Sequence, residues 1–317
     1  MRKFFQGLWR GVIAVFRFIF NVIAFPFRLA FGILAFPFRK IHQFHKFLNT
    51  EPDERPITEV FIDLTTNKDT RQMLWDQIEA LRMHILRAVI ALTITVIASL
   101  WIAQDLLEFL AIPVDGLEKL QAIQVTEEIG VFMRVAMYAG IAAAFPYIAF
   151  EVWLFAAPGL KPREKKMGLV GIPFATLLFL TGMAFTYFIL IPAALPFLGS
   201  FTKIAQFWAA SEYFAFVTGL MFWIGIFFEF PLVIYVLSSM GLVKPAILAQ
   251  QWRMAIVIIA IVAAAVTPTI DPVNMGLVML PMILLYFISI GLSYIADAGR
   301  KQKIAQEEAN VNVESAG

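Results

Sequence analysis

The sequence of 317 residues contains no cysteine and few charged residues. Without cysteine the chain has no disulfide bonds, no thiolate metal sites and no sulfur that carries a lipid. Charged residues make up 15% of the chain, whereas soluble domains have about 25%. Hydrophobic residues make up 60%, and the mean hydropathy is +0.78. These values exclude a pair of soluble domains and indicate an integral membrane protein.

The sequence also lacks the usual signatures of catalysis and of cofactor binding. It has no glycine-rich phosphate loop, no metalloprotease helix motif and no serine elbow. His42 and His45 have a spacing that places them on one helix face, but two histidines without further ligands do not make a metal site. We therefore predict no cofactor, no metal, no enzymatic activity and no nucleic-acid partner.

The first 48 residues form a basic, phenylalanine-rich extension without a single carboxylate. Within it "FRFIFNVIAFP" is followed at once by "FRLAFGILAFP" and then by "FRK". Eleven residues are close to three helical turns, so Arg17, Arg28 and Arg39 return to nearly the same face. We predict that residues 1–48 lie as an amphipathic segment on the inner leaflet of the lipid bilayer; a transmembrane hairpin is the alternative.

A polar linker and a membrane domain follow the extension. Residues 49–73 are predicted as the linker, residues 74–299 as the membrane domain and residues 300–317 as a cytoplasmic tail. The apolar spans of the membrane domain are about 83–103, 129–157, 167–190, 213–243, 254–267 and 275–296. The fold class is therefore predicted to be all-α, a polytopic membrane protein with six transmembrane helices of which the last two are short.

The positions of lysine and arginine in the loops predict the orientation of the protein in the membrane. Loop 158–166 contains "LKPREKK" and the tail opens with several cations, whereas loop 104–128 carries six carboxylates against one lysine. Basic loops stay on the cytoplasmic side. Both termini and loops 158–166 and 244–253 are therefore expected inside the cell, and loops 104–128, 191–212 and 268–274 outside.

Carboxylates next to the predicted first and third spans are candidate binding groups. Glu164 lies among four cations, where it either balances their charge or binds a cationic ligand, because carboxylate and guanidinium form two parallel hydrogen bonds. Before the first span, Asp76, Glu79 and Arg82 follow one another at intervals of three residues. On a helix they are surface neighbours that form local ion pairs or line a binding surface shared with Glu164.

Glu229 is the one clearly intramembrane carboxylate that we identify, and it lies in the fourth span two residues before Pro231. This span is longer than the bilayer requires, so we expect Pro231 to kink it or the span to tilt. A charge at that depth is costly and usually faces a protein interior, a wet cavity or a partner. Arg134 in the second span is its candidate partner, unless Arg134 snorkels to the outer surface. Asp271 in "TPTIDP" is predicted to be a turn residue between the last two spans.

From about residue 74 to residue 299 the chain resembles TatC, the core receptor subunit of the twin-arginine protein translocase. The resemblance rests on several motifs in the family's order. They are "TEEIGVFMR" (126–134) with the mid-span Pro146 after it, "VWLFAAPGLKPREKK" (152–166), "GMAFTYFILIPAALPFL" (182–198), "EYFAFVTGLMFWIGIFFEFPLVIYVLSSMGLV" (212–243) and "TPTIDP" (267–272).

The resemblance implies a concave helical bundle and assigns roles to individual residues. Glu164 corresponds to the acid that contacts the twin arginines of the signal peptide, and Phe155 to an aromatic residue of the same region. Glu229, in the family's Glu-x-Pro motif, corresponds to the intramembrane acid that meets the partner subunits TatA and TatB. Pro113 corresponds to a proline of the first outer loop.

One part of the binding motif departs from the family. TatC proteins usually have His-Leu-x-Glu-Leu-Arg before the first span, whereas this chain has "QIEALR". Ala80 stands at the position of the second acid, and Glu79 comes one residue early, which is a rotation of about 100° on a helix. Glu79 is therefore expected to reach a signal peptide only if the segment rotates or bends, whereas Arg82 keeps the family position in the same predicted binding region.

The function implied by the resemblance is recognition of folded precursor proteins through their twin-arginine signal peptides. The resemblance further implies that binding leads to assembly of a translocation site driven by the proton-motive force. The expected partners are TatA-like and TatB-like single-span subunits. This chain is expected to form a homo-oligomer in the cytoplasmic membrane. The alternative is a secondary transporter in which Glu229 carries a proton or cation. The absence of paired repeat halves in the sequence argues against it.

Overall fold

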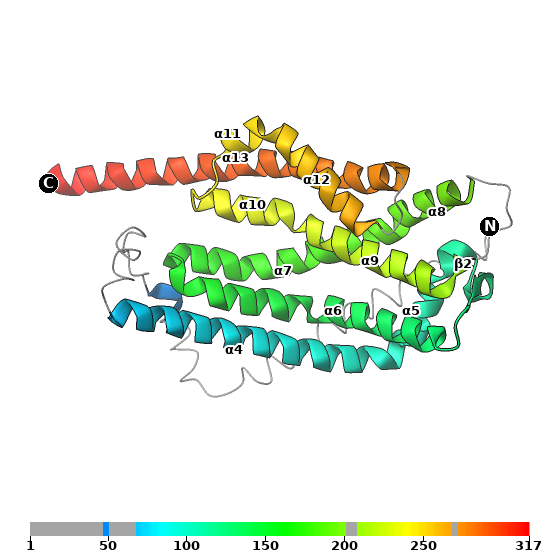
Figure 1. Cartoon of the computed structure of the whole chain (residues 1–317). Helices are drawn as coiled ribbons and strands as arrows, with labels where there is room; N and C mark the ends of the chain where they lie inside the picture. The colour runs from blue at the N-terminus through cyan, green and yellow to red at the C-terminus, as the bar shows by residue number, and fades with distance from the viewer. Residues whose placement is uncertain (1–46, 51–67, 201–207, 268–271, 317) are drawn as a thin grey trace, which may run out of the picture. The chain divides into compact units, whose positions relative to one another are not determined.

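The computed structural model describes residues 47–50, 68–200, 208–267 and 272–316 (Figure 1). Nearly all of them are helical. Among them are five helices long and apolar enough to cross a membrane and the shorter apolar helix Trp252–Val266, so the predicted all-α membrane bundle is confirmed. The repeat with its arginines, both histidines of the extension, most of the linker and Asp271 lie outside the described residues.

The described chain divides into two compact units, called unit 1 and unit 2 below. Unit 1 contains the residues up to Gln104 together with Ala136–Thr176, and unit 2 contains Asp105–Val135 together with the residues from Leu177 onward. The predicted division into extension, linker, membrane domain and tail stays a prediction.

Unit 1 is built on three helices that run side by side in Figure 1. They are α4 (Lys68–Ser99), the second part of α6 (Glu127–Ala156) and the first part of α7 (Pro162–Phe185). α4 begins inside the predicted linker, because the sequence from Lys68 onward consists mostly of residues that tolerate a helix well. Pro146 lies within α6 and does not end it.

α4 and α6 approach each other closely at one glycine. A Cβ atom on Gly140 would lie 2.6 Å from the Cα atom of Val96, so only glycine fits there without a shift of the helices. The hydroxyl of Thr95 donates a hydrogen bond to the Gly140 carbonyl, at 2.9 Å. Most large apolar side chains of α4 are not covered by other described parts of the protein, as is typical of a helix that faces lipid.

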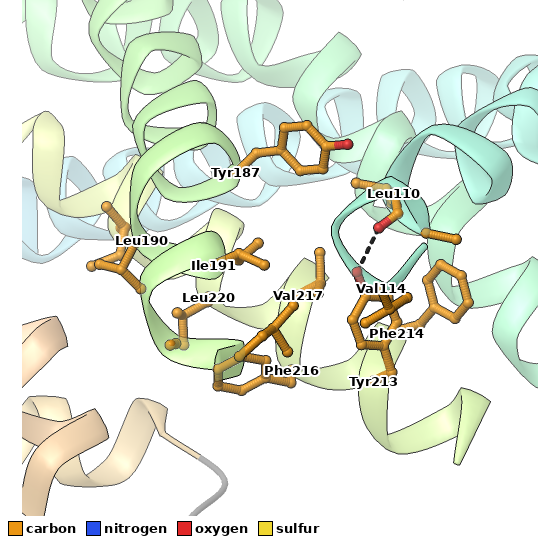
Figure 2. Packing of buried hydrophobic residues seen from close by; sticks show 14 of the residues in the cluster. Leu110, Val114, Tyr187, Leu190, Ile191, Tyr213, Phe214, Phe216, Val217 and Leu220 are labelled. Carbon is orange, nitrogen blue, oxygen red and sulfur yellow. Dashed lines mark hydrogen bonds between the residues drawn. The ribbon is translucent and has the colours of Figure 1, made fainter. Parts of the chain in front are cut away.

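The segment after α4 differs from the predicted outer loop 104–128, because it opens with a helix. A 3₁₀ turn at Leu100–Ile102 connects α4 to α5 (Ala103–Leu110). The last carbonyl groups of α5 are capped by side chains from distant helices, since the hydroxyl of Tyr187 donates to the Phe109 carbonyl at 2.5 Å and that of Tyr213 to the Leu110 carbonyl at 2.7 Å. Figure 2 shows the second of these bonds.

Pro113 lies in the 3₁₀ turn Ile112–Val114 that follows α5. The turn ends at Asp115 with φ 65° and Gly116 with φ 105°, and this left-handed backbone reverses the chain. A proline fits the first positions of such a turn, because a backbone N–H there would have no hydrogen-bond partner within the turn.

The core of unit 2 forms where α5 and the start of α6 meet the later helices (Figure 2). The later helices are α8 (Ile191–Ser200) and α9 (Ala210–Phe228), and a π-helical turn, Thr186–Leu190, precedes α8. Fully buried side chains of this core include Ile191, Phe214, Val217 and Leu220.

A small parallel strand pair, which the all-α prediction did not include, joins β1 (Leu120–Gln121) to β2 (Trp208–Ala209). Glu127 fixes it: its carboxylate accepts hydrogen bonds from the N–H groups of Ile123, Gln124 and Ser211 at 2.7, 3.0 and 2.7 Å. Arg134 donates to the Ser211 carbonyl at 3.2 Å. Arg134 therefore serves this junction, and its predicted pairing with Glu229 is wrong.

The remaining helices of unit 2 are α10 (Phe230–Ser239), α11 (Pro245–Gln250), α12 (Trp252–Val266) and α13 (Pro272–Ala316). α10 and α12 both pack along α13 (Figure 1). The buried hydroxyls of Ser238 and Ser293 lie 2.6 Å apart and join α10 to α13. α13 continues past the predicted last span, because the residues after 296 are mostly good helix formers.

Candidate functional site

Glu164 is held at the start of α7. The helix begins with Pro162, so Lys161 is the capping residue and Glu164 is the third helical residue. The Oε2 atom of Glu164 accepts a hydrogen bond from the Lys161 N–H at 2.9 Å, which is the glutamate half of a capping box. Among the described residues this bond involves Oε2 only, so Oε1 is available to a ligand. Glu164 therefore caps the helix, a role that the two alternatives predicted from the sequence, charge balance and ligand binding, did not include.

Lys165, the residue after Glu164, has its ammonium group inside the protein. Its residue exposure is 2%, and its Nζ atom donates to the carbonyls of Phe47 at 3.3 Å and Thr50 at 2.8 Å. Nζ also lies 5.0 Å from the centre of the Phe47 ring, within range of a cation–π contact. The other three cations of the loop, Lys161, Arg163 and Lys166, are exposed.

A small apolar cluster packs beside Lys165. Leu48 is buried there with Trp153, Ala157 and Ile172. The indole N–H of Trp153 donates to the Lys165 carbonyl at 3.1 Å. A Cβ atom on Gly168 would lie 2.6 Å from that indole, so a glycine is needed for Trp153 to lie against α7.

The structure reveals a polar cluster around the buried Glu151 that the sequence reasoning missed. Nδ1 of His84 on α4 lies 2.6 Å from Oε2 of Glu151 on α6, and the hydroxyl of Tyr147 donates to Oε1 of Glu151, also at 2.6 Å. Glu151 is 3% exposed. Glu229 is therefore not the only carboxylate within a predicted span, because Glu151 lies inside the second. The sequence signal for Glu151 was a carboxylate within an apolar run, "FEVW" at 150–153.

The candidate aromatic contact lies next to this cluster. The ring of Phe155 meets the imidazole of His84 edge to face, with centroids 6.1 Å apart and planes at 67°. Glu79 and Arg82 form the local ion pair expected from their spacing, at 3.4 Å, with side chains 61% and 75% exposed.

Glu229 lies in unit 2, at a break in the fourth span. α9 ends at Phe228 and α10 begins at Phe230, so the break expected from Pro231 is present; proline provides no N–H and its ring clashes with the preceding turn. The buried Oε1 atom of Glu229 has no hydrogen-bond partner among the described residues. Its carboxyl group makes one hydrogen bond with the Phe179 backbone.

Comparison with known proteins shows the family of the chain. The family model for Sec-independent protein translocase protein (TatC) matches residues 76–281. The chain belongs to the TatC family. TatC of Deinococcus radiodurans is 32% identical over 231 residues, which are 70% of this chain and 86% of that protein. TatC of Koribacter versatilis is 36% identical over 193 residues, or 60% and 71% of the two chains.

A solved structure agrees with this TatC assignment. The crystal structure of a twin arginine translocase receptor, TatC, superposes with a TM-score of 0.63 at 31% identity and covers 69% of this chain and 99% of that one. The chain is accordingly a multi-pass membrane protein and a component of a Sec-independent protein translocase. Residues 47–50, which hold Lys165, precede the part matched by the TatC family model.

Proposed function

We propose that this TatC protein is the receptor subunit of a twin-arginine translocase in the cytoplasmic membrane. It binds the twin-arginine signal peptides of folded precursors and starts assembly of a translocation site driven by the proton-motive force. Both termini and the loop that carries Glu164 face the cytoplasm, as the positions of lysine and arginine require. The observation that carries the proposal is the fixed carboxylate of Glu164 at the start of α7.

The position of Glu164 suits a guanidinium ligand. A carboxylate has about four lone-pair sites, so the bond to the Lys161 N–H leaves capacity for two parallel hydrogen bonds from an arginine. A lysine ammonium cannot match this planar geometry. The fixed carboxylate also loses little conformational freedom when the ligand binds.

Other residues of unit 1 extend the surface for the peptide. The edge-to-face pair of Phe155 and His84 provides an aromatic contact for apolar residues of a signal peptide. Glu79 and Arg82 lie on the exposed face of α4, where Glu79 serves as a second acceptor once its ion pair with Arg82 opens and the start of α4 rotates or bends toward the peptide. Exposed pairs of this kind contribute at most about 1 kcal/mol, so opening it costs little.

Photo-crosslinking tests the receptor function. A photoreactive residue at position 163 keeps the Glu164 carboxylate intact, because the native Arg163 is exposed and adjoins it. We expect a peptide with Arg-Arg to be labelled about tenfold more strongly than the same peptide with Lys-Lys, since only guanidinium binds in the two-bond geometry. Equal labelling of both peptides, or none, would refute the receptor function. Proton flux in proteoliposomes would then test the transporter alternative.

The second part of the proposal concerns the partner subunits. An unpaired buried acceptor at membrane depth favours a partner that donates a hydrogen bond, and Oε1 of Glu229 is such an acceptor among the described residues. We propose that single-span TatA-like and TatB-like subunits bind at the break beside Pro231, and that this chain also associates with copies of itself.

Substitution of Glu229 tests the partner contact. Glu229→Ala is expected to weaken association with the single-span subunits about fivefold, the effect of one hydrogen bond of about 1 kcal/mol between helices in a membrane. Glu229→Gln keeps an acceptor of similar shape and should retain most of the association. Co-purification of the subunits with each variant measures this, with binding of the Arg-Arg peptide as the control that should not change. Normal recovery of partners with Glu229→Ala would contradict the assignment.

A further inference from the structure

The segment 47–50 docks onto the helices that carry the proposed acceptor. It lies outside the part of the chain matched by the TatC family model. Three observations describe the docking: the side chain of Leu48 is buried beside Trp153 and Ile172, the Phe47 ring lies over the Lys165 ammonium, and two carbonyls of the segment accept hydrogen bonds from that ammonium. Residues 47–50 are called the strap below.

The surroundings of Glu164 pose an electrostatic problem for a receptor of cationic peptides. Four cations adjoin the acceptor in sequence, and each of them repels an incoming arginine and lowers the effective negative potential at Glu164. In the structure one of the four is withdrawn from the surface. Lys165 is 2% exposed and its ammonium donates to strap carbonyls, whereas Lys166 beside it is exposed.

The contacts between the strap and the helices satisfy the polar groups of Lys165. A buried ammonium is costly unless its hydrogen bonds are satisfied, and here the carbonyls of Phe47 and Thr50 both accept from it. The Trp153 indole N–H holds the backbone carbonyl of the same lysine, and Gly168 leaves the space that this indole needs. Both the side chain and the backbone of Lys165 are therefore fixed.

We propose that the strap determines the affinity of the Glu164 site for cationic peptides by holding the Lys165 ammonium away from it. The inference rests on the proposed function, because it assigns the electrostatic tuning of the same site. Lys165 and the strap set the affinity of the site without contacting the peptide. When the strap leaves, the ammonium of Lys165 returns to the surface around Glu164 and competes with the arginines of the ligand.

Docking is tested first, without a peptide. The chain has no cysteine, so Leu48→Cys and Asn49→Cys each provide a single thiol. Leu48 is buried and Asn49 is exposed, so a maleimide should label Leu48→Cys at least about tenfold more slowly. Adding Lys165→Met should remove most of this protection, and the matched change Lys166→Met should not. Equal rates at both thiols in the otherwise native chain would show that the strap is not docked.

The effect on binding is tested by a double substitution cycle with an Arg-Arg peptide. Undocking the strap with Phe47→Ala and Leu48→Ala together is expected to weaken binding about three- to tenfold. This is the effect of one added cation near the site, with the effective dielectric constant that is typical of groups at a protein surface. Lys165→Met alone should bind like the native chain. Combined with Lys165→Met, undocking should have almost no effect, because the cation that it would release is gone.

Each outcome of the cycle has a separate meaning. If Lys165→Met alone, which also releases the strap, weakens binding as much as the undocked variant does, the strap acts mechanically and the electrostatic inference is overturned. Equal weakening by undocking with and without Lys165 overturns it as well. No effect of undocking on binding also overturns it. Thermal unfolding of the undocked variant checks that its membrane domain stays folded. A native chain that binds Arg-Arg and Lys-Lys peptides equally would refute the proposed receptor function, while the thiol rates would still report on docking.

Discussion

Glutamine in place of Glu164 is expected to weaken binding of an Arg-Arg peptide by roughly 30- to 100-fold while leaving the protein as stable as before. The loss corresponds to about 2 to 3 kcal/mol, the difference between a bidentate carboxylate–guanidinium pair and a single hydrogen bond from the arginine to a neutral amide oxygen. Stability should be kept because glutamine also completes a capping box, so its side-chain oxygen accepts the Lys161 N–H in the same way. Peptide binding to purified protein and its thermal unfolding measure the two effects.

Two control variants separate binding from capping at this position. Glu164→Ala removes both roles and should lower stability by about 1 kcal/mol in addition to the loss of binding. Lys166→Gln removes an exposed cation of the same loop without touching the cap, so it should leave stability unchanged and strengthen peptide binding by up to a few fold. If Glu164→Gln bound the peptide normally, Glu164 would be a helix cap only, and the peptide acceptor would lie elsewhere.

The sequence predicted those features that depend on local pattern. Apolar runs of about 20 residues located the spans, and a proline in the middle of the fourth located the break next to Glu229. The local ion pair of Glu79 and Arg82 followed from their spacing on a helix. Each of these signals lies within a few turns of the residue that it describes.

The missed features depend on residues far apart in the chain. Glu151 meets a histidine 67 positions away, and Lys165 meets carbonyls more than a hundred positions away. Arg134 was a candidate partner of Glu229 because both lie in predicted spans, but it donates instead to the carbonyl of Ser211 beside a small strand pair. Charge and hydropathy alone do not determine which helix faces meet.

The polar cluster around Glu151 leads to the largest expected effect on stability. Glu151→Leu leaves the half-buried imidazole of His84 and the half-buried hydroxyl of Tyr147 without their shared acceptor, and it should lower the free energy of unfolding by about 3 kcal/mol. Glu151→Gln should cost only about 1 kcal/mol, because its carbonyl accepts from Tyr147 and its amide donates to a neutral imidazole. Unfolding by dodecyl sulfate in mixed micelles measures both. The matched control is Glu128→Leu, an exposed carboxylate of the same helix, which should change stability by less than about 0.5 kcal/mol.

A double substitution cycle shows whether the cluster joins α4 to α6. In a Tyr147→Phe background, His84→Leu and Glu151→Leu should each destabilise the protein, because the first leaves the buried Glu151 carboxylate without its partner and the second does the same to the half-buried His84. The double variant should be clearly more stable than the sum of the two losses predicts, since two apolar side chains then pack where a polar pair was. Additive losses would mean that the two side chains do not depend on each other, and that the position of α4 relies on its contact at Gly140 instead. Because His84 also holds the edge of the Phe155 ring, a coupled pair would link the position of α4 to the aromatic part of the proposed peptide surface.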